Sequence, residues 1–402
     1  MRRLTWFLLL LFAFAIPWEY SLDLGPPLGN IARIAGLVLL LAAIPAIAQA
    51  GRLRTPGSLQ WLVLAYFVWF CCSLFWSIDF QITLAKVRGY FQEFMVVWLV
   101  WEFAETPTDL RNLLRAYVAG CWVLAVLTVM NLGSPGASSQ IRFAAVGQDP
   151  NDVARFIDLG FPMAALLLER ESKWAGKLLA WGYLPLGLTG VLLTASRGGS
   201  LAALVAMAGC GLLMIRSRRP ASVGAVVASP LLLAFLWLAV PRGPLARIGT
   251  IYEQLRGGDL NQRFNLWHAG WQAFAHAPFL GSGAGSFVSA ARLSTIDTAH
   301  NTALAIVVEG GICALFLATA ILAVSVLAVS RTHGAVRIAF ATALAVWIVT
   351  SLVATVEESR TTWLLLAMTA LAGRLATEDL EALGRCFGGN FKNNQSAFHG
   401  TV

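Results

Sequence analysis

Residues 302–329 read TALAIVVEGGICALFLATAILAVSVLAV, a run in which Glu309 is the one charged side chain. A helix of about 20 apolar residues spans the roughly 30 Å hydrocarbon layer of a bilayer, so this run predicts a transmembrane helix. Similar runs recur along the 402 residues, of which 58% are hydrophobic and 12% are charged. Soluble domains carry about 25% charged residues. The sequence therefore predicts an all-α integral membrane protein without a separate soluble domain.

Twelve such runs predict a single polytopic membrane domain over residues 1–402, a bundle of about twelve transmembrane helices. The first run follows Arg3 and lacks a small-residue cleavage site, so we expect an uncleaved helix rather than a signal peptide. The expected spans are 4–17, 31–49, 59–76, 84–103, 112–131, 153–169, 176–193, 200–215, 223–240, 302–329, 335–355 and 362–376.

Basic residues gather in alternate connections between these spans. The connections hold Arg2 and Arg3, Arg52 and Arg54, Arg111 and Arg115, Arg170 with Lys173 and Lys177, Arg216 with Arg218 and Arg219, Arg331 and Arg337, and Arg374 with Arg385 and Lys392. The positive-inside rule places them in the cytoplasm, together with both termini and a tail over residues 377–402. Membrane topology thus accounts for the net charge of +8, and we expect no nucleic-acid partner.

The connections on the opposite face are short except in three regions, which are residues 132–152, 194–199 and 241–301. The third region is expected to be a long periplasmic loop, because long loops cross the membrane largely regardless of their charge. Within it, residues 265–279 carry apolar side chains at helical spacing. This spacing predicts an amphipathic helix that lies on the membrane surface.

Arg197 lies on this outer face between two spans, next to Gly198 and Gly199 in the sequence SRGG at residues 196–199. An arginine at membrane depth needs a partner, and a planar guanidinium binds phosphate oxygens through two parallel hydrogen bonds. A substrate phosphate is therefore one expected partner. The alternative partner is a lipid headgroup or a structural carboxylate. The sequence alone does not distinguish this alternative from a substrate phosphate.

Three further arginines are candidate substrate contacts. Arg263 opens the amphipathic segment, and Arg142 and Arg155 flank the sequence DPND at residues 149–152. This sequence predicts a helix N-terminus with proline at an early position.

His300 and Asn301 lie where the long loop meets the span 302–329. A neutral imidazole accepts a proton from a sugar hydroxyl near pH 7, so His300 is a candidate general base; a helix cap is the alternative. Glu309 lies further along the same span and is expected to orient a partner or to form a buried ion pair.

Patterns typical of metal and nucleotide sites are missing from the sequence. It contains no His-x-x-x-His, Cys-x-x-Cys or Asp-x-Asp, and no glycine-rich phosphate loop. We therefore expect no metal, no cofactor and a donor substrate that is not a nucleotide.

The pattern of apolar spans together with these polar residues resembles the O-antigen ligase and O-antigen polymerase superfamily of bacterial envelope glycosyltransferases. The resemblance rests on residues 149–151, 194–201, 263–285 and 300–311. Two spacings are similar to the ligase branch: Arg197 is followed by Leu201, and a histidine at 300 is followed after ten residues by Gly311.

The resemblance implies a fold of the integral-membrane C-type glycosyltransferase kind in the bacterial inner membrane, with the active site facing the periplasm. It implies an undecaprenyl-diphosphate-linked glycan as donor and an inverting, metal-independent transfer. In the ligase branch the acceptor is a hydroxyl of the lipid A core oligosaccharide in lipopolysaccharide biosynthesis. Arg197 and His300 are then the expected catalytic residues. The expected substrate-binding residues are Arg142, Arg155, Arg263, Asn301 and Glu309.

Two alternatives remain at this point. The arginines of residues 241–292 are also typical of the polymerase branch, in which a second lipid-linked repeat unit of O-antigen or exopolysaccharide is the acceptor. A secondary transporter for a small anion also fits twelve helices and buried arginines. The missing internal repeat and the long outer loop argue against a transporter.

Overall fold

The computed structural model describes residues 1–25, 29–134, 141–170, 173–217, 240–257, 263–293 and 298–393. In this part of the chain every regular element is a helix, and one isolated β-bridge joins Asp23 and Asn30. The prediction of an all-α protein is confirmed for these residues.

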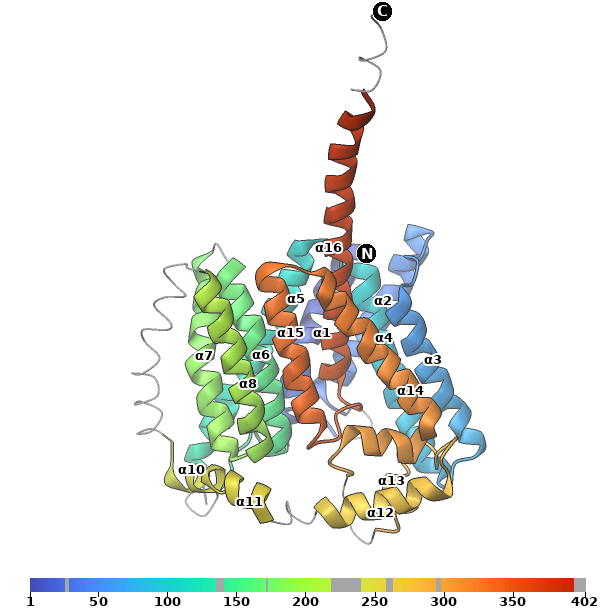
Figure 1. The fold of residues 1–402 in the computed structure, drawn as a ribbon, viewed down its shortest axis with the longest axis vertical. Coiled ribbons are helices and arrows are strands. Elements are labelled where there is room, and N and C mark those ends of the chain that lie inside the picture. The colour runs from blue at the N-terminus through green and yellow to red at the C-terminus, as the bar shows by residue number, and fades with distance from the viewer. Residues whose placement is uncertain are drawn as a thin grey trace, which may run out of the picture.

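The long helices stand side by side, and the short helices α10 to α13 lie across one end of the bundle (Figure 1). The N-terminus and the extension of α16 lie at the other end (Figure 1). The helices are α1 (Arg2–Ala15), η1 (Ile16–Ser21), α2 (Ile31–Ala50), α3 (Ser58–Cys72), η2 (Ser73–Phe75), α4 (Phe80–Phe103), α5 (Pro107–Met130), η3 (Asn131–Gly133), α6 (Pro150–Arg170), α7 (Trp174–Thr194), α8 (Arg197–Ser217), α10 (Arg242–Gly249), α11 (Ile251–Gly257), α12 (Arg263–His276), α13 (Phe287–Ala290), α14 (Thr302–Arg331), α15 (Gly334–Ser351) and α16 (Arg360–Asn393).

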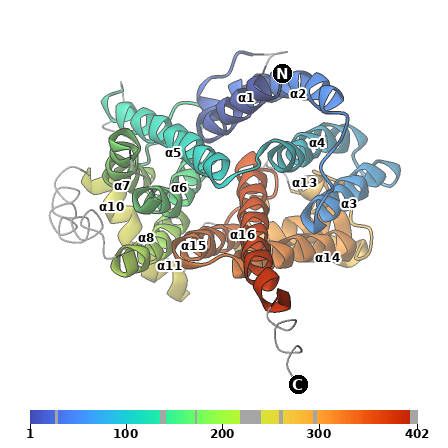
Figure 2. The same ribbon diagram turned by 90° about the horizontal axis from the view of Figure 1, so that it is seen from above.

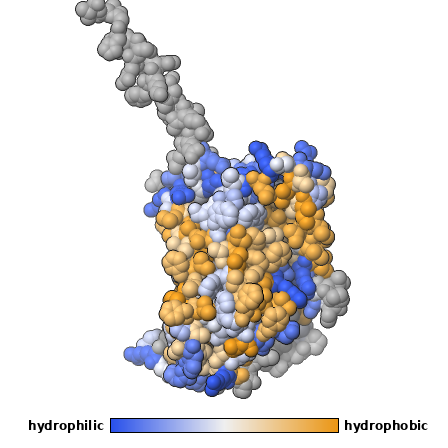
Figure 3. Space-filling view, turned by 90° about the vertical axis from the view of Figure 1, so that its right-hand side faces the viewer, coloured by the Kyte–Doolittle hydropathy of each residue, from blue (hydrophilic) through white to orange (hydrophobic). Residues whose placement is uncertain are grey.

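Among the described residues, eight helical segments are long and apolar enough to cross a membrane, so the chain is a membrane protein. They are α1 with η1, α2, α3 with η2, α5 with η3, α7, α8, α14 and α15. On the face that Figure 3 shows, mostly apolar side chains lie between two polar ends.

Four of the twelve expected spans are not among these eight segments. The expected spans 84–103, 153–169 and 362–376 fall on helices α4, α6 and α16, in which charged residues interrupt the apolar sequence. The expected span 223–240 lies outside the described residues apart from Val240. The number of twelve spans therefore stays a prediction.

Helix α6 forms the centre of one half of the bundle. All of its residues from Val153 to Leu168 are buried, and it packs against α5, α7, α8 and α15. Figure 2 shows α6 enclosed by α5, α7 and α8. A charged side chain that faces lipid is costly. Because α6 is enclosed by other helices, its buried residues Arg155 and Asp158 do not face lipid.

Helix α14 is broken at Gly311, which has a φ of +68°. The chain between α12 and α13 inserts into this break: Ser282 N donates to Val308 O at 2.9 Å, and Ile312 N donates to Pro278 O at 2.9 Å. A Cβ atom at position 311 would come within 2.1 Å of Phe279 O, so only glycine allows the approach. The insertion fixes α12 against α14.

The region expected as a long loop, residues 241–301, contains four helices, α10 to α13. The amphipathic helix expected over residues 265–279 corresponds to α12, Arg263–His276. The expected tail also begins as helix, because α16 continues to Asn393.

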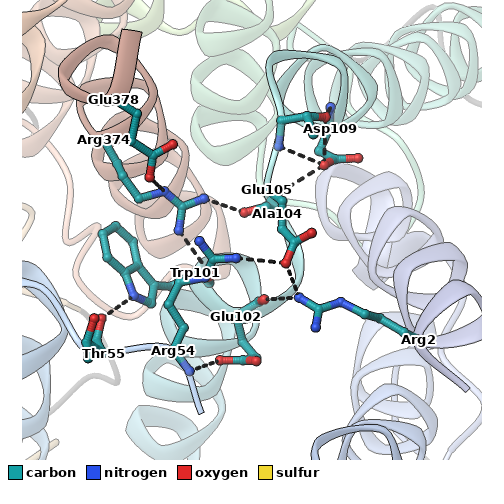
Figure 4. A network of polar contacts seen from close by, with 11 residues as sticks. Arg2, Arg54, Thr55, Trp101, Glu102, Ala104, Glu105, Asp109, Arg374 and Glu378 are labelled. Atoms are coloured by element: carbon teal, nitrogen blue, oxygen red, sulfur yellow. Dashed lines mark hydrogen bonds and ion pairs between the residues drawn. The ribbon is translucent and has the colours of Figure 1, made fainter. Parts of the chain in front are cut away.

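Polar contacts tie several helices together at the end of the bundle that carries the N-terminus (Figure 4). Glu105 pairs with Arg2 and with Arg54, whose Nη2 atom lies 2.9 Å from Glu105 Oε1. Arg374 of α16 lies 4.6 Å from the centroid of the Trp101 ring and donates to the carbonyl oxygen of that residue at 3.3 Å. Arginines from three separate basic connections thus share one end of the bundle, as the alternation of basic connections predicts.

Candidate functional site

Four arginines meet at the opposite end of the bundle. Arg142, Arg197, Arg247 and Arg263 line one cavity of about 130 Å³. They come from the segment before α6, the first residue of α8, helix α10 and the first residue of α12. The structure therefore brings together three of the arginines that the sequence predicts as site residues, Arg142, Arg197 and Arg263. Arg247 was not among the predicted site residues.

The turn between α7 and α8 holds Arg197 in place. Ala195 ends α7 in the left-handed conformation with a φ of 49°, and Ser196 Oγ then accepts a hydrogen bond from Gly199 N at 3.2 Å. A Cβ atom at Gly199 would lie 2.4 Å from the Cβ atom of Ala154 in α6. The glycine therefore lets α8 begin against α6, and Arg197, the first residue of α8, lines the cavity.

Helix α6 begins beside the same cavity. Pro150 is its first residue, and Asp149 Oδ1 accepts a hydrogen bond from Asn151 N at 2.7 Å. The helix start that the sequence predicts at residues 149–152 is confirmed. The amide oxygen of Asn151 also accepts hydrogen bonds from Arg142 Nη2 at 2.7 Å and from Ser196 Oγ at 2.9 Å. The sequence motif contains Asn151, but its role as the link between Arg142 and the α8 turn becomes visible only in the structure.

Arginines are the charged side chains in the described lining of the cavity. Among the described residues that line it, none is a carboxylate. Burial lowers the pKa of the Arg142 guanidinium, and the charges of Arg247, Arg197 and Arg263 lower it further, whereas Asp149 opposes them. The N-termini of α6 and α8 add the partial positive charge of their helix dipoles. An anion with several oxygens is the ligand that such a cavity stabilises best.

Arg155 lies directly behind this cavity. It lines a smaller adjoining space of about 20 Å³ together with Asn151, Ser196 and Arg263. Its Nη2 atom pairs with Asp152 Oδ1 at 2.9 Å, and Nε and Nη1 are buried without a hydrogen-bond partner in the described part of the chain. Arg155, which the sequence predicts as a site residue, is thus close to the arginine cavity, but its guanidinium already forms an ion pair with Asp152.

His300 is not among the residues that line the arginine cavity. Its neighbour Asn301, however, contacts the chain segment 352–353, which borders the cavity. Asn301 Nδ2 donates to Leu352 O at 3.4 Å, and Val353 lines the arginine cavity. His300 has a φ of 46°, a conformation that is uncommon for residues other than glycine and is often found at functional sites. Asn301 caps α14 by accepting a hydrogen bond from Leu304 N at 2.9 Å. The helix cap that we considered for His300 is therefore formed by its neighbour.

Helix α12 connects the arginine cavity to His300. Arg263 is its first residue, and Trp267 follows one turn later, about 6 Å along the axis. Trp267 Nε1 donates to Ala299 O at 3.0 Å, next to His300. One short helix thus holds both a guanidinium of the cavity and the backbone that presents the imidazole.

Glu309 lies away from the arginine cavity, at the break of α14. Its Oε2 atom accepts a hydrogen bond from Gly285 N at 2.6 Å, and the side chain is buried. This carboxylate therefore holds the glycine-rich segment that inserts into α14. The arrangement differs from the ion pair with an arginine that the sequence suggests.

Within the described ranges, no group of three or more His, Cys, Asp or Glu side chains is arranged to hold a metal ion. The residues that could hold an anionic group are the four arginines of the cavity, with Gln254 as an additional polar neighbour.

The chain was compared with models of known protein families. Residues 183–319 match a family model described as O-Antigen ligase. The match includes Arg197, Arg247, Arg263, His300 and Glu309, and it confirms the resemblance over this stretch. No curated protein matches the chain.

Proposed function

Starting from the O-antigen ligase pattern of residues 183–319, we propose that this membrane glycosyltransferase is an O-antigen ligase. It transfers O-antigen from undecaprenyl diphosphate to a hydroxyl of the lipid A core oligosaccharide. It lies in the bacterial inner membrane with both termini in the cytoplasm and the arginine cavity facing the periplasm. The observation that supports this proposal most directly is the cavity that Arg142, Arg197, Arg247 and Arg263 line together.

The arginines bind the diphosphate of the donor. Arg197 and Arg263 contact it from the first residues of α8 and α12, while Arg142 is oriented by Asn151. Guanidinium groups can form two parallel hydrogen bonds with phosphate oxygens. Negative charge grows on the diphosphate as it leaves, and fixed cations in a site shielded from water stabilise that charge.

His300 acts as the general base. The acceptor hydroxyl loses its proton to the imidazole, and its oxygen forms a bond to the anomeric carbon from the face opposite the diphosphate. The bond between that carbon and the phosphate oxygen breaks, and its electron pair leaves with undecaprenyl diphosphate. The sugar configuration is inverted. Asn301 and the Trp267 contact to Ala299 fix the backbone on either side of the imidazole.

A polymerase is the second candidate. Arg247 and Arg263 come from the segment that is arginine-rich in the polymerase branch, and both line the cavity. A polymerase uses the same donor chemistry but transfers the glycan to another lipid-linked repeat unit.

A deletion strain separates the two functions. Loss of a ligase leaves long glycan chains on the carrier lipid, whereas loss of a polymerase leaves a single repeat on the lipid A core. We expect the first result, with function restored by the wild-type gene and not by Arg197→Ala or His300→Ala. Loss of one fixed donor at a transition state costs roughly 10²–10³-fold in rate. Arg197→Lys should restore little, because lysine cannot form the paired contact.

Arg242→Ala is the matched control, because Arg242 is exposed on α10 and outside the cavity. Membrane content and thermal stability of each variant show whether it is folded. Full ligation by a folded Arg197→Ala or His300→Ala variant excludes that residue from the mechanism. Labelling that places position 197 or 300 in the cytoplasm excludes the shared site.

A further inference from the structure

A second cavity lies at the end of the bundle that carries the N-terminus, far from the four arginines (Figure 1). It has a volume of about 570 Å³ and lies between α5, α6, α15 and α16. Cavities that bind small molecules have volumes of roughly 300–1,000 Å³. The proposed glycosyl transfer makes no use of this cavity.

The cavity has an apolar wall and a basic mouth. Leu110, Leu166 and Leu375 form part of the wall, and each belongs to a different helix. Arg111, Arg170 and His333 lie at the ends of α5, α6 and α15. None of the described lining residues is an aspartate or a glutamate. The lining therefore fits a molecule with an anionic head and an apolar chain.

Arg111 provides an independent sign of a missing partner. Its Nε atom is buried, and no hydrogen-bond acceptor for it exists in the ranges that the structure describes. Arg2 and Arg54, which lie at the same end of the bundle, both pair with Glu105. A buried donor without an acceptor is costly, so an anion at the mouth of the cavity would lower the free energy of the folded protein.

We propose that this cavity binds one anionic phospholipid from the adjacent membrane leaflet. The phosphodiester lies between Arg111 and Arg170, and one acyl chain lies along the leucine wall. A lipid fits better than a free anion, because most of the lining is apolar and the cations are confined to the mouth. Basic pockets between transmembrane helices are typical binding sites for anionic lipid headgroups. The bound lipid joins α5, α6 and α16 and stabilises this end of the bundle.

The test uses the purified full-length protein in detergent. Native mass spectrometry and thermal unfolding are measured with phosphatidylglycerol, with phosphatidylcholine of the same acyl chains, and with glycerol 3-phosphate. We expect one phosphatidylglycerol per chain and a rise in the unfolding temperature with this lipid alone. In Arg111→Gln/Arg170→Gln, affinity for phosphatidylglycerol should fall at least about tenfold.

Two further variants make the result specific. Ala376→Trp fills the cavity from α16 but keeps both arginines, so it should also prevent lipid binding. Arg52→Gln removes an exposed cation outside the cavity and should leave binding unchanged. Equal binding of both lipids, equal stabilisation by glycerol 3-phosphate, or undiminished binding by Ala376→Trp each overturns the proposal. Because the measurement is lipid binding, its outcome is independent of whether the protein is a ligase or a polymerase.

Discussion

The guanidinium of Arg142 donates a hydrogen bond to the amide oxygen of Asn151 across 2.7 Å. The same oxygen accepts a hydrogen bond from Ser196 Oγ at 2.9 Å. One neutral side chain thus orients an arginine of the cavity and supports the turn before Arg197. A carboxylate at this position would also orient Arg142, but it would compete with a phosphate for the guanidinium groups. The amide provides the geometry without the negative charge.

Asn151→Asp should therefore weaken the binding of the lipid-linked donor more than Asn151→Ala. The new carboxylate lowers the positive potential of the cavity, whereas alanine removes only the hydrogen bonds. We expect KM for the donor to rise roughly tenfold or more in Asn151→Asp, because a charge-assisted contact is worth about 1.5–3 kcal/mol. The measurement is transfer by purified protein at varied donor concentration. A donor KM in Asn151→Asp equal to that of Asn151→Ala would contradict the electrostatic role.

Arg247→Gln should reduce transfer, and Arg242→Gln should not. Both residues belong to α10, but Arg247 lines the cavity with its Nε atom buried, and Arg242 is exposed outside it. Arg197 Nε also donates to the carbonyl oxygen of Arg247 at 3.5 Å, and this contact is kept in the glutamine variant. A loss of about 10- to 100-fold in kcat/KM is expected for Arg247→Gln. Equal activity of the two variants would remove Arg247 from the site.

Gly311→Ala should strongly destabilise the protein. The backbone at Gly311 has a φ of +68°, which is unfavourable for alanine, and an added Cβ atom would lie only 2.1 Å from Phe279 O. We expect a loss of at least about 2 kcal/mol and a lower temperature of thermal unfolding in detergent. Gly211→Ala in α8 is the control, since a Cβ atom there has no heavy atom within 4 Å. Alanine is favoured in a helix interior, so the control should be at least as stable as the wild type.

Glu357→Gln should stabilise the protein at pH 8 and have little effect at pH 4. Burial raises the pKa of Glu357 from 4.5 to about 7, although the charge of Lys86 opposes the shift. Between these values the folded protein binds a proton that the unfolded chain has lost, so stability falls as the pH rises toward 7 and then levels off. The glutamine variant lacks this loss, which is about 3 kcal/mol at most. Thermal unfolding across pH 4–8 measures it, with exposed Glu253→Gln as the control. A constant difference across this range would contradict the assignment.

Three arginines of the candidate site could be predicted from local sequence. Arg197 lies between two apolar runs, where a charge is costly, Arg142 flanks the predicted helix start at residues 149–152, and Arg263 opens the predicted amphipathic segment. The structure places all three around one cavity. The predicted start of α6 at Pro150 is confirmed for a similar reason, because proline and a preceding aspartate favour a helix N-terminus irrespective of tertiary contacts.

Arg247 and Asn151 could not be singled out in the same way. Arg247 is one of several arginines between residues 241 and 292, and its spacing does not distinguish it from exposed Arg242. The role of Asn151 depends on Arg142 and on Ser196, which lies 45 residues further along the chain. The hydrogen bond that the Glu309 carboxylate accepts from Gly285 N likewise joins segments 24 residues apart, and the sequence does not indicate it.

The sequence by itself determined that this chain is an all-helical membrane protein and that its cations fall into two groups. The physical reason is local: apolar runs partition into lipid, and a charge near them needs a partner or water. Only the tertiary structure decided which arginines share a cavity, that α14 is broken to receive the segment around Gly281, and that α12 links Arg263 to the backbone beside His300. These relationships depend on close approach between segments far apart in the chain, and hydrophobic periodicity does not encode such distances.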